Sequence, residues 1–123
     1  MPDQSNGKST SIQIDVELDP KNIPRKIAWS ADDQPGGKAP QECKAMLLAF
    51  FDKEHKETVR IDLWTQDMQV VEMDRFFFQT LRSMADTYFK ATQNAGLASD
   101  MQRFVQYFGE KTEIIPGAGE KGR

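Results

Sequence analysis

His55 and Cys43 are the residues whose side chains are most often used in catalysis. A histidine acts as a general acid, a general base or a metal ligand, and a cysteine thiolate acts as a nucleophile. His55 is the single histidine and lies in a charged turn at residues 52–57, where a solvated ring is expected. Cys43 has no partner histidine in a recognisable motif, so we expect a small buried apolar side chain. The sequence therefore predicts no enzyme, no catalytic residue, and no metal or cofactor.

Three carboxylates, Asp15, Glu17 and Asp19, follow one another at two-residue spacing. In a strand this spacing puts them on one outward face, roughly 7 Å apart, where they could bind a cation or a basic peptide. The basic residues Lys26 and Arg60 on neighbouring strands offer cross-strand partners. We therefore expect a solvated, ion-paired face.

Large aromatic side chains offer a different chemistry, which is the burial of apolar surface against another protein. Trp64 shares the outward face of its strand with Arg60 and Asp62, which indicates a contact surface. The phenylalanines at residues 76–78 spread over about 200° of a helix, an arc that is hard to bury in one small core. Four residues are therefore predicted to bind a partner protein: Trp64, Phe76, Phe78 and Phe89.

The first two elements expected to position these side chains are antiparallel strands. Apolar and polar residues alternate strictly from Ile12 to Leu18, which is the pattern of a strand with one buried face. Turn chemistry at residues 19–22 separates this strand from a second one after Pro24. A loop at residues 32–40, rich in proline and glycine, ends the second strand.

The stretch from Cys43 to Phe51 fits either a helix or a strand. The short polar turn that follows favours a hairpin with the run from Thr58 to Thr65, so we choose a third strand and a fourth. Both faces of the third strand are apolar, which implies a central strand or a face that another subunit buries. The fourth strand is expected to turn inward its apolar residues Val59, Ile61 and Leu63.

A long helix is predicted from Val71 to Gln93, and its apolar arc is wider than the roughly 100° that a surface helix needs. One stripe, expected to face the sheet, consists of Met73, Phe76, Phe77, Leu81, Met84, Tyr88 and Ala91. A second strip contains Phe78, Ala85 and Phe89. We expect a last helix, with capping-box spacing at Ser99 and Gln102, to cover part of this strip and a subunit partner to cover the rest.

These elements predict the α+β class: a four-stranded antiparallel meander followed by a long helix and a shorter C-terminal helix packed on one face. We expect a single domain over residues 11–113, between disordered tails at residues 1–10 and 114–123. The formal net charge is −3, which argues against nucleic acid as a partner. Because no apolar run is long enough to span a membrane and the first residues lack the apolar core of a signal peptide, we expect a cytoplasmic protein without membrane insertion.

Four short strings, VELD at 16–19, PRKIAW at 24–29, RIDLWT at 60–65 and MDRFF at 73–77, stand in a fixed order and spacing. In these strings the chain resembles the gliding-motility protein GldC family of Bacteroidota. The resemblance implies association with gliding motility and the neighbouring type IX secretion machinery, and it carries over no catalytic residue. The order of elements is also similar to the monomer of the SecB export chaperone, which implies a chaperone-like role by analogy of fold.

The leading hypothesis is a non-enzymatic accessory protein that binds other proteins of the gliding or secretion machinery and forms a homo-oligomer. The alternative is a domain that binds a small ligand or lipid, or a weak enzyme, with an apolar pocket between the sheet and the long helix. The residues expected to line that pocket are Met46, Leu48, Met73 and Met84. A third possibility is a purely structural subunit of a larger complex.

Overall fold

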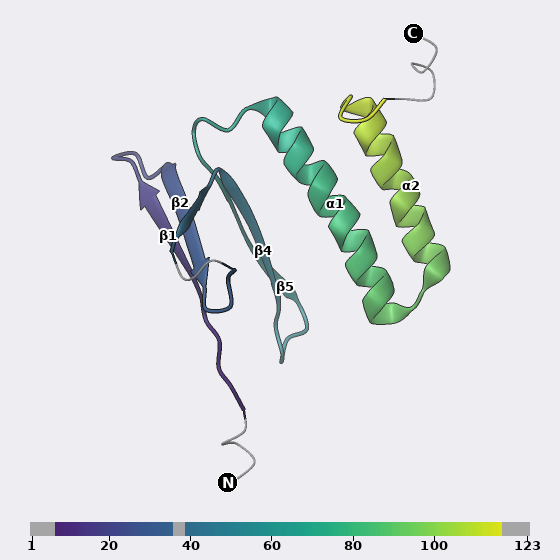
Figure 1. Cartoon of the computed structure of the whole chain (residues 1–123), viewed down its shortest axis with the longest axis horizontal. Helices are drawn as coiled ribbons and strands as arrows, with labels where there is room; N and C mark the ends of the chain where they lie inside the picture. The colour runs from purple at the N-terminus through teal and green to yellow at the C-terminus, as the bar shows by residue number, and fades with distance from the viewer. Residues whose placement is uncertain (1–6, 36–38, 117–123) are drawn as a thin grey trace. The chain divides into compact units, whose positions relative to one another are not determined.

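The computed structural model describes residues 7–35 and 39–116. The chain folds as two compact units, one that ends at Met68 and one that begins at Gln69 (Figure 1). The first unit holds five strands and the second unit two helices, which confirms the α+β class. In chain order the elements are β1 (Ile12–Leu18), β2 (Pro24–Ala31), β3 (Gln41–Cys43), β4 (Ala45–Phe51), β5 (Thr58–Trp64), α1 (Val70–Thr92) and α2 (Ala95–Lys111).

The strand β2 is the central strand of a three-stranded antiparallel sheet, β1-β2-β3. The predicted alternation in β1 and the predicted pairing of β1 with β2 are confirmed, since Val16 lies opposite Ile27. Ile27 in turn lies opposite Cys43 of β3 and is fully buried. The apolar face of this sheet is therefore the core of the strand unit.

The predicted third strand is divided at Lys44, so the predicted four-stranded meander is replaced by two antiparallel sheets. Before Lys44 the chain pairs with β2, and after it the chain pairs with β5. Thr65 holds this division in place, because its backbone N–H donates to the Lys44 carbonyl at 2.8 Å and its hydroxyl lies 3.3 Å from the same oxygen. The residues from Cys43 to Phe51 are thus extended, as chosen, but they serve two sheets.

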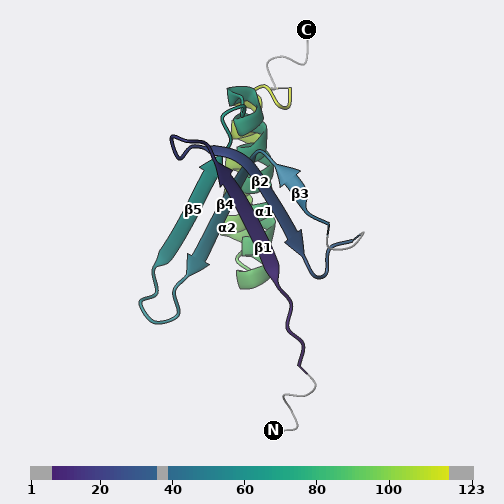
Figure 2. The ribbon, with the colours of Figure 1, turned by 90° about the vertical axis from the view of Figure 1, so that its left-hand side faces the viewer.

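The strands β4 and β5 form a hairpin whose register is unbroken from Ala45 opposite Trp64 to Phe51 opposite Thr58. Asp52 closes the turn, because its carboxylate accepts hydrogen bonds from the backbone N–H groups of Glu54 and His55. Figure 2 shows that β1 and β2 run across the direction of β4 and β5.

The turn between β1 and β2 is organised by Asp19. Its carboxylate accepts the backbone N–H groups of Lys21 at 2.8 Å and Ile23 at 3.0 Å, and also the side-chain amide of Gln66. Asp19 therefore ties the β1–β2 turn to the segment that follows β5, instead of joining an outward acidic row as expected.

The helix α1 begins and ends within one residue of the predicted bounds. The carboxylate of Glu72 accepts the backbone N–H of Gln69 at the N-terminus, and Gln93 ends the helix in the left-handed region. The helix α2 begins earlier than the capping-box spacing indicated, because the Asn94 side chain accepts the backbone N–H of Leu97 at 3.1 Å and so serves as the N-cap. Ser99 therefore lies inside the helix.

The two helices lie side by side as an antiparallel pair (Figure 1). We expected α2 to cover part of the second apolar strip of α1, and it does. Phe78 and Ala85 of this strip are buried, as are Ala98 and Val105 of α2. Packing of the helices on the sheet, and with it the likeness to SecB, stays a prediction.

The folded part of the chain extends further beyond α2 than the sequence indicated. Ile114 and Ile115 were expected in the C-terminal tail, but their backbone N–H groups donate to the Gly109 carbonyl at 2.9 and 3.2 Å. Glu113 makes the required reversal with a positive φ of 63°. Most of both predicted tails, residues 1–6 and 117–123, lies outside the described residues.

Candidate functional site

One face of the β4–β5 hairpin is entirely apolar. Side chains alternate along a strand, and residues directly opposite each other share a face, so three cross-strand pairs build this surface. We call it the apolar hairpin face, and it consists of the pairs Met46–Leu63, Leu48–Ile61 and Phe50–Val59.

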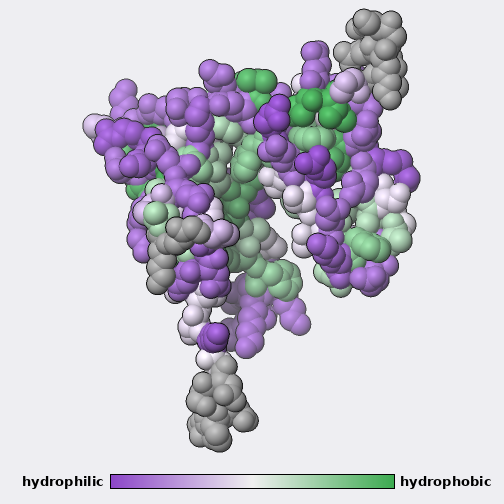
Figure 3. Space-filling view, in the orientation of Figure 1, coloured by the Kyte–Doolittle hydropathy of each residue, from purple (hydrophilic) through white to green (hydrophobic). Residues whose placement is uncertain are grey.

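The apolar hairpin face is accessible towards its turn end. Phe50 is 55% exposed, Val59 58% and Ile61 44%, whereas the other three members are half-buried. Figure 3 shows hydrophobic residues gathered over the region of this hairpin. Scattered single apolar residues are ordinary on a protein surface, but a contiguous patch on two paired strands indicates a contact surface.

The opposite face of the hairpin carries the charged residues and one tryptophan. The Arg60 guanidinium binds the Asp62 carboxylate with two contacts, 2.9 and 3.3 Å long. Trp64 lies on the same face of β5 and is 54% exposed, which agrees with its predicted outward orientation. The hairpin therefore presents apolar side chains on both faces: both strands supply them on the apolar hairpin face, whereas on the opposite face they come from β4 and from Trp64.

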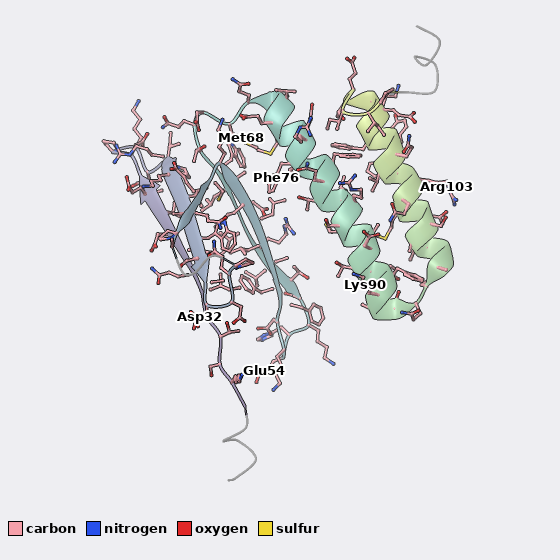
Figure 4. All side chains as sticks on the ribbon, in the orientation of Figure 1. Asp32, Glu54, Met68, Phe76, Lys90 and Arg103 are labelled. Atoms are coloured by element: carbon pink, nitrogen blue, oxygen red, sulfur yellow. The ribbon has the colours of Figure 1, made fainter. Side chains whose placement is uncertain are left out.

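A groove of about 690 Å³ runs along the helix α1, and Met101 of α2 lines one side of it. At 100° per residue Phe76 points about 180° away from the buried Ala85, and Figure 4 shows Phe76 on that side of the helix. The groove is lined by aromatic and thioether side chains with a few hydroxyl groups between them. These residues are Phe76, Gln79, Thr80, Ser83, Met84, Thr87, Tyr88 and Ala91 of α1 and Met101 of α2.

The four residues predicted to bind a partner are distributed over both units. Trp64 belongs to the strand unit, whereas Phe76, Phe78 and Phe89 lie on α1. Phe78 is only 6% exposed, because α2 covers it, so its predicted contact with another protein is not available in this fold. Phe89, at 40% exposed, and Phe76 in the groove remain accessible.

The accessible residues of the apolar hairpin face are not among the partner-binding residues predicted from the sequence. The sequence pattern predicts that Val59 and Ile61 lie on a buried face, and that the second face of the neighbouring strand, with Phe50, needs cover. Both observations concern the same surface, because the register puts Phe50 directly opposite Val59. The register between β4 and β5 was the signal that could have identified the apolar hairpin face.

The two candidates for chemistry have ordinary structural surroundings. Cys43 is half-buried beside Ile27, and burial raises the pKa of its thiol, which disfavours the nucleophilic thiolate. His55 is exposed, and its ring lies 3.0 Å from the Asp52 carboxylate. The backbone N–H of His55, more than its ring, holds the pKa of Asp52 below its usual range. Among the described residues no group of three potential metal-ligating side chains occurs.

The outward face of β1 is matched by cations of β2. Glu17 binds the Arg25 guanidinium at 3.5 Å and lies opposite Lys26 in the register. Asp15 and other residues of β1 and β2 line a shallow depression of about 270 Å³. The expected cross-strand pairing of these carboxylates is therefore present for Glu17.

Neither helix of the described part of the chain is long and apolar enough to cross a membrane. No curated protein and no solved structure matches the chain. The sequence model of one family, described as gliding motility-associated protein GldC-like, matches residues 24–114, which run from the start of β2 to just beyond α2. The chain therefore belongs to the GldC-like family.

Proposed function

We propose that this chain is a cytoplasmic, non-enzymatic accessory protein of gliding motility and of the neighbouring type IX secretion machinery. In this role it binds other proteins as a chaperone-like protein or adaptor. Membership of the GldC-like family supports the association with gliding motility. The observation that carries the binding role is the apolar hairpin face, with its accessible Phe50, Val59 and Ile61.

The shape of the apolar hairpin face favours an extended apolar segment as its ligand. From Met46 to Phe50 the surface extends over roughly 14 Å, since residues two apart in a strand lie about 7 Å apart. An extended chain places every second side chain on one side with the same spacing, so an alternating apolar segment matches it. Unfolded or unassembled proteins expose such segments.

The free energy available on this surface is moderate, as a reversible binding protein requires. Full burial of a large apolar side chain contributes about 1.5–3 kcal/mol. Phe50, Val59 and Ile61 are each about half exposed, so their complete burial would contribute roughly 2–4 kcal/mol in sum. Further affinity must come from the ligand's own apolar surface and from backbone hydrogen bonds.

Neighbouring residues on opposite faces of β4 offer a matched test. We expect Phe50→Ser to weaken binding of reduced, permanently unfolded α-lactalbumin by about fivefold to tenfold. Phe51→Ser, which truncates the next and more exposed residue on the other face, should bind like the unchanged chain. Urea unfolding of both variants shows whether the strand unit is intact. Equal binding by all three proteins would contradict the proposal, as would equal weakening by both variants.

A second candidate function is binding of a small apolar ligand in the groove on α1. Its volume of about 690 Å³ lies in the usual range for small-molecule sites, roughly 300–1,000 Å³. Of the four residues predicted to line a pocket, Met84 lines this groove. A fluorescent fatty acid should bind the unchanged chain and Met84→Leu but not Met84→Glu. Absence of saturable binding to the unchanged chain would remove this candidate.

A further inference from the structure

The outer edge of β5 is open in the strand unit. Both strands of the two-stranded sheet are outer strands, and within the described residues 7–35 and 39–116 no strand except β4 pairs with β5. The backbone bonds between Thr65 and Lys44 and between Asp52 and Glu57 mark the hydrogen-bonded pairs of the hairpin. Odd-numbered residues of β5 therefore bond to β4. The residues that direct their backbone groups to the outer edge are Thr58, Arg60, Asp62 and Trp64.

β5 lacks the proline, the bulge and the short length that often protect an outer strand from pairing. It is seven residues long, contains neither proline nor glycine, and keeps an unbroken register with β4. The outer strand β1 of the other sheet differs, because its register shifts between Glu17 and Leu18. A bulge of this kind turns an edge away from further pairing.

The sequence of β5, TVRIDLW, is complementary to itself in the antiparallel direction. If a second copy is centred on Ile61, Arg60 lies opposite Asp62 of that copy, and Asp62 lies opposite its Arg60. Val59 then lies opposite Leu63 on the apolar face. The residues with outward backbone groups also meet each other, so Arg60 and Asp62 of the second copy form a hydrogen-bonded pair with opposite charges.

The neighbouring registers are unfavourable because they bring like charges together. Centring the pair on Arg60 puts two guanidinium groups opposite each other, and centring it on Asp62 puts two carboxylates opposite each other. In β1 a pair centred on Asp15 or on Val16 is unfavourable, since Asp15 would face itself or Glu17 of the second copy. For a second copy paired with β5, charge and hydrogen-bonding parity thus select one register.

We propose that a second copy of this chain pairs with β5 in the antiparallel direction, centred on Ile61, to form the continuous sheet β4-β5-β5-β4. The pairing joins the apolar hairpin faces of both copies into one surface twice as large. The proposed dimer does not rest on the proposed function. The outer edge of β5 forms the dimer, whereas the apolar hairpin face would bind another protein.

Charge reversal on β5 tests the register. Sedimentation at increasing concentration should show a reversible dimer for the unchanged chain. Arg60→Asp and Asp62→Arg should each raise the dimer dissociation constant about tenfold or more, because each puts two like-charged pairs across the interface. An equimolar mixture of both variants should dimerise again, since every pair is then oppositely charged, and the double swap in one chain should do the same.

The matched control is Asp15→Arg on β1, which should leave the dimer unchanged. Circular dichroism checks that the variants fold. We expect them to fold, because the side chains of Arg60 and Asp62 are both exposed to solvent. A monomer at all concentrations would overturn the proposal. A dimer that is insensitive to both reversals, or a mixture that fails to recover, would also overturn it.

A disulfide across the two-fold axis gives a positional test. Residues opposite each other in a non-hydrogen-bonded antiparallel pair have Cα atoms about 4.5 Å apart, within the range that a disulfide spans. In a Cys43→Ser background, Ile61→Cys should form a covalent dimer on mild oxidation. Val59→Cys, two residues away on the same face, should not, because it lies opposite Leu63 of the second copy. Equal cross-linking of both would contradict the register. If Phe50→Ser weakens binding of unfolded α-lactalbumin and leaves the dimer intact, the dimer and the proposed binding function are shown to depend on different residues.

Discussion

The ring of Phe78 fills the space that a side chain at Gly109 would need. A Cβ atom at Gly109 would lie 2.6 Å from Cε1 of Phe78 and 2.8 Å from Cγ1 of Ile115. Because glycine has no side chain, Phe78 is buried against α2 and Ile115 folds back over the same residue. One glycine thus joins the middle of α1, the end of α2 and the segment after it.

Gly109→Ala should destabilise the helical unit in spite of alanine's higher helix propensity. The gain from propensity is about 1 kcal/mol, whereas overpacking a rigid site costs typically 1–3 kcal/mol. Contacts below 3.0 Å with a ring and with a branched side chain require both neighbours to move. We expect a net loss of up to about 2 kcal/mol in the free energy of unfolding, measured by urea denaturation.

Gly96→Ala is the matched control for this prediction. Gly96 lies in the first turn of α2, and the nearest atom to a Cβ built there is 4.0 Å away. The same substitution should therefore stabilise the protein slightly, by up to about 1 kcal/mol. Equal effects of the two substitutions would show that Gly109 is not close-packed.

The regular elements were predictable because their periodicity is local. Alternation from Ile12 to Leu18 and the helical pattern of α1 follow from the residues themselves. The division at Lys44 has no such local signal, because it depends on hydrogen bonds from Thr65, which lies 21 residues further along the chain. The stretch from Cys43 to Phe51, which contains Lys44, was therefore predicted as one strand.

The candidate site was predictable only in part, for a related reason. A helical wheel gives the direction of Phe78 and Phe89 but not the position of the neighbour that covers them. α2 covers the strip at Phe78 and leaves Phe89, near the end of α1, accessible. In the same way, alternation gives the two faces of β5 but does not reveal that both faces carry exposed residues.

Phe78 and Phe89, treated alike in the sequence analysis, should respond differently to truncation. Phe78→Ala removes a buried ring and should cost about 3–5 kcal/mol of the free energy of unfolding. Phe89→Ala removes a side chain that is 40% exposed and should cost clearly less. Thermal unfolding of both variants measures the difference. A smaller loss for Phe78 than for Phe89 would contradict the packing of α2 on α1.

The N-terminus of α2 can be located by two alanine substitutions. Asn94→Ala removes the side-chain oxygen that accepts the Leu97 N–H and should cost about 1 kcal/mol. Ser99→Ala lies inside the helix and should be neutral or slightly stabilising, because alanine is the better helix former. If Ser99 were the cap, as its spacing to Gln102 had indicated, the two effects would be reversed.

Acid should weaken the strand unit through the carboxylates of its turns. Hydrogen bonds hold the pKa of Asp19, Asp52 and Asp67 below the usual range, with the largest contributions from the Ile23 backbone, the His55 backbone and the Thr65 side chain, respectively. The folded chain therefore binds fewer protons at these sites than the unfolded chain. Their contribution to stability is complete above a pH of about 4 and is lost as the pH falls through the lowered pKa values.

Asp52→Asn isolates one of these groups. The amide oxygen still accepts a hydrogen bond but does not titrate, so the variant should be less stable than the unchanged chain at pH 7 and should lose less stability on acidification. Urea unfolding midpoints at pH 7 and pH 3 measure both effects. A variant that loses as much stability as the unchanged chain between these pH values would contradict the linkage to Asp52. The His55 N–H, 2.6 Å from the carboxylate, would then bind the neutral acid as well as the anion.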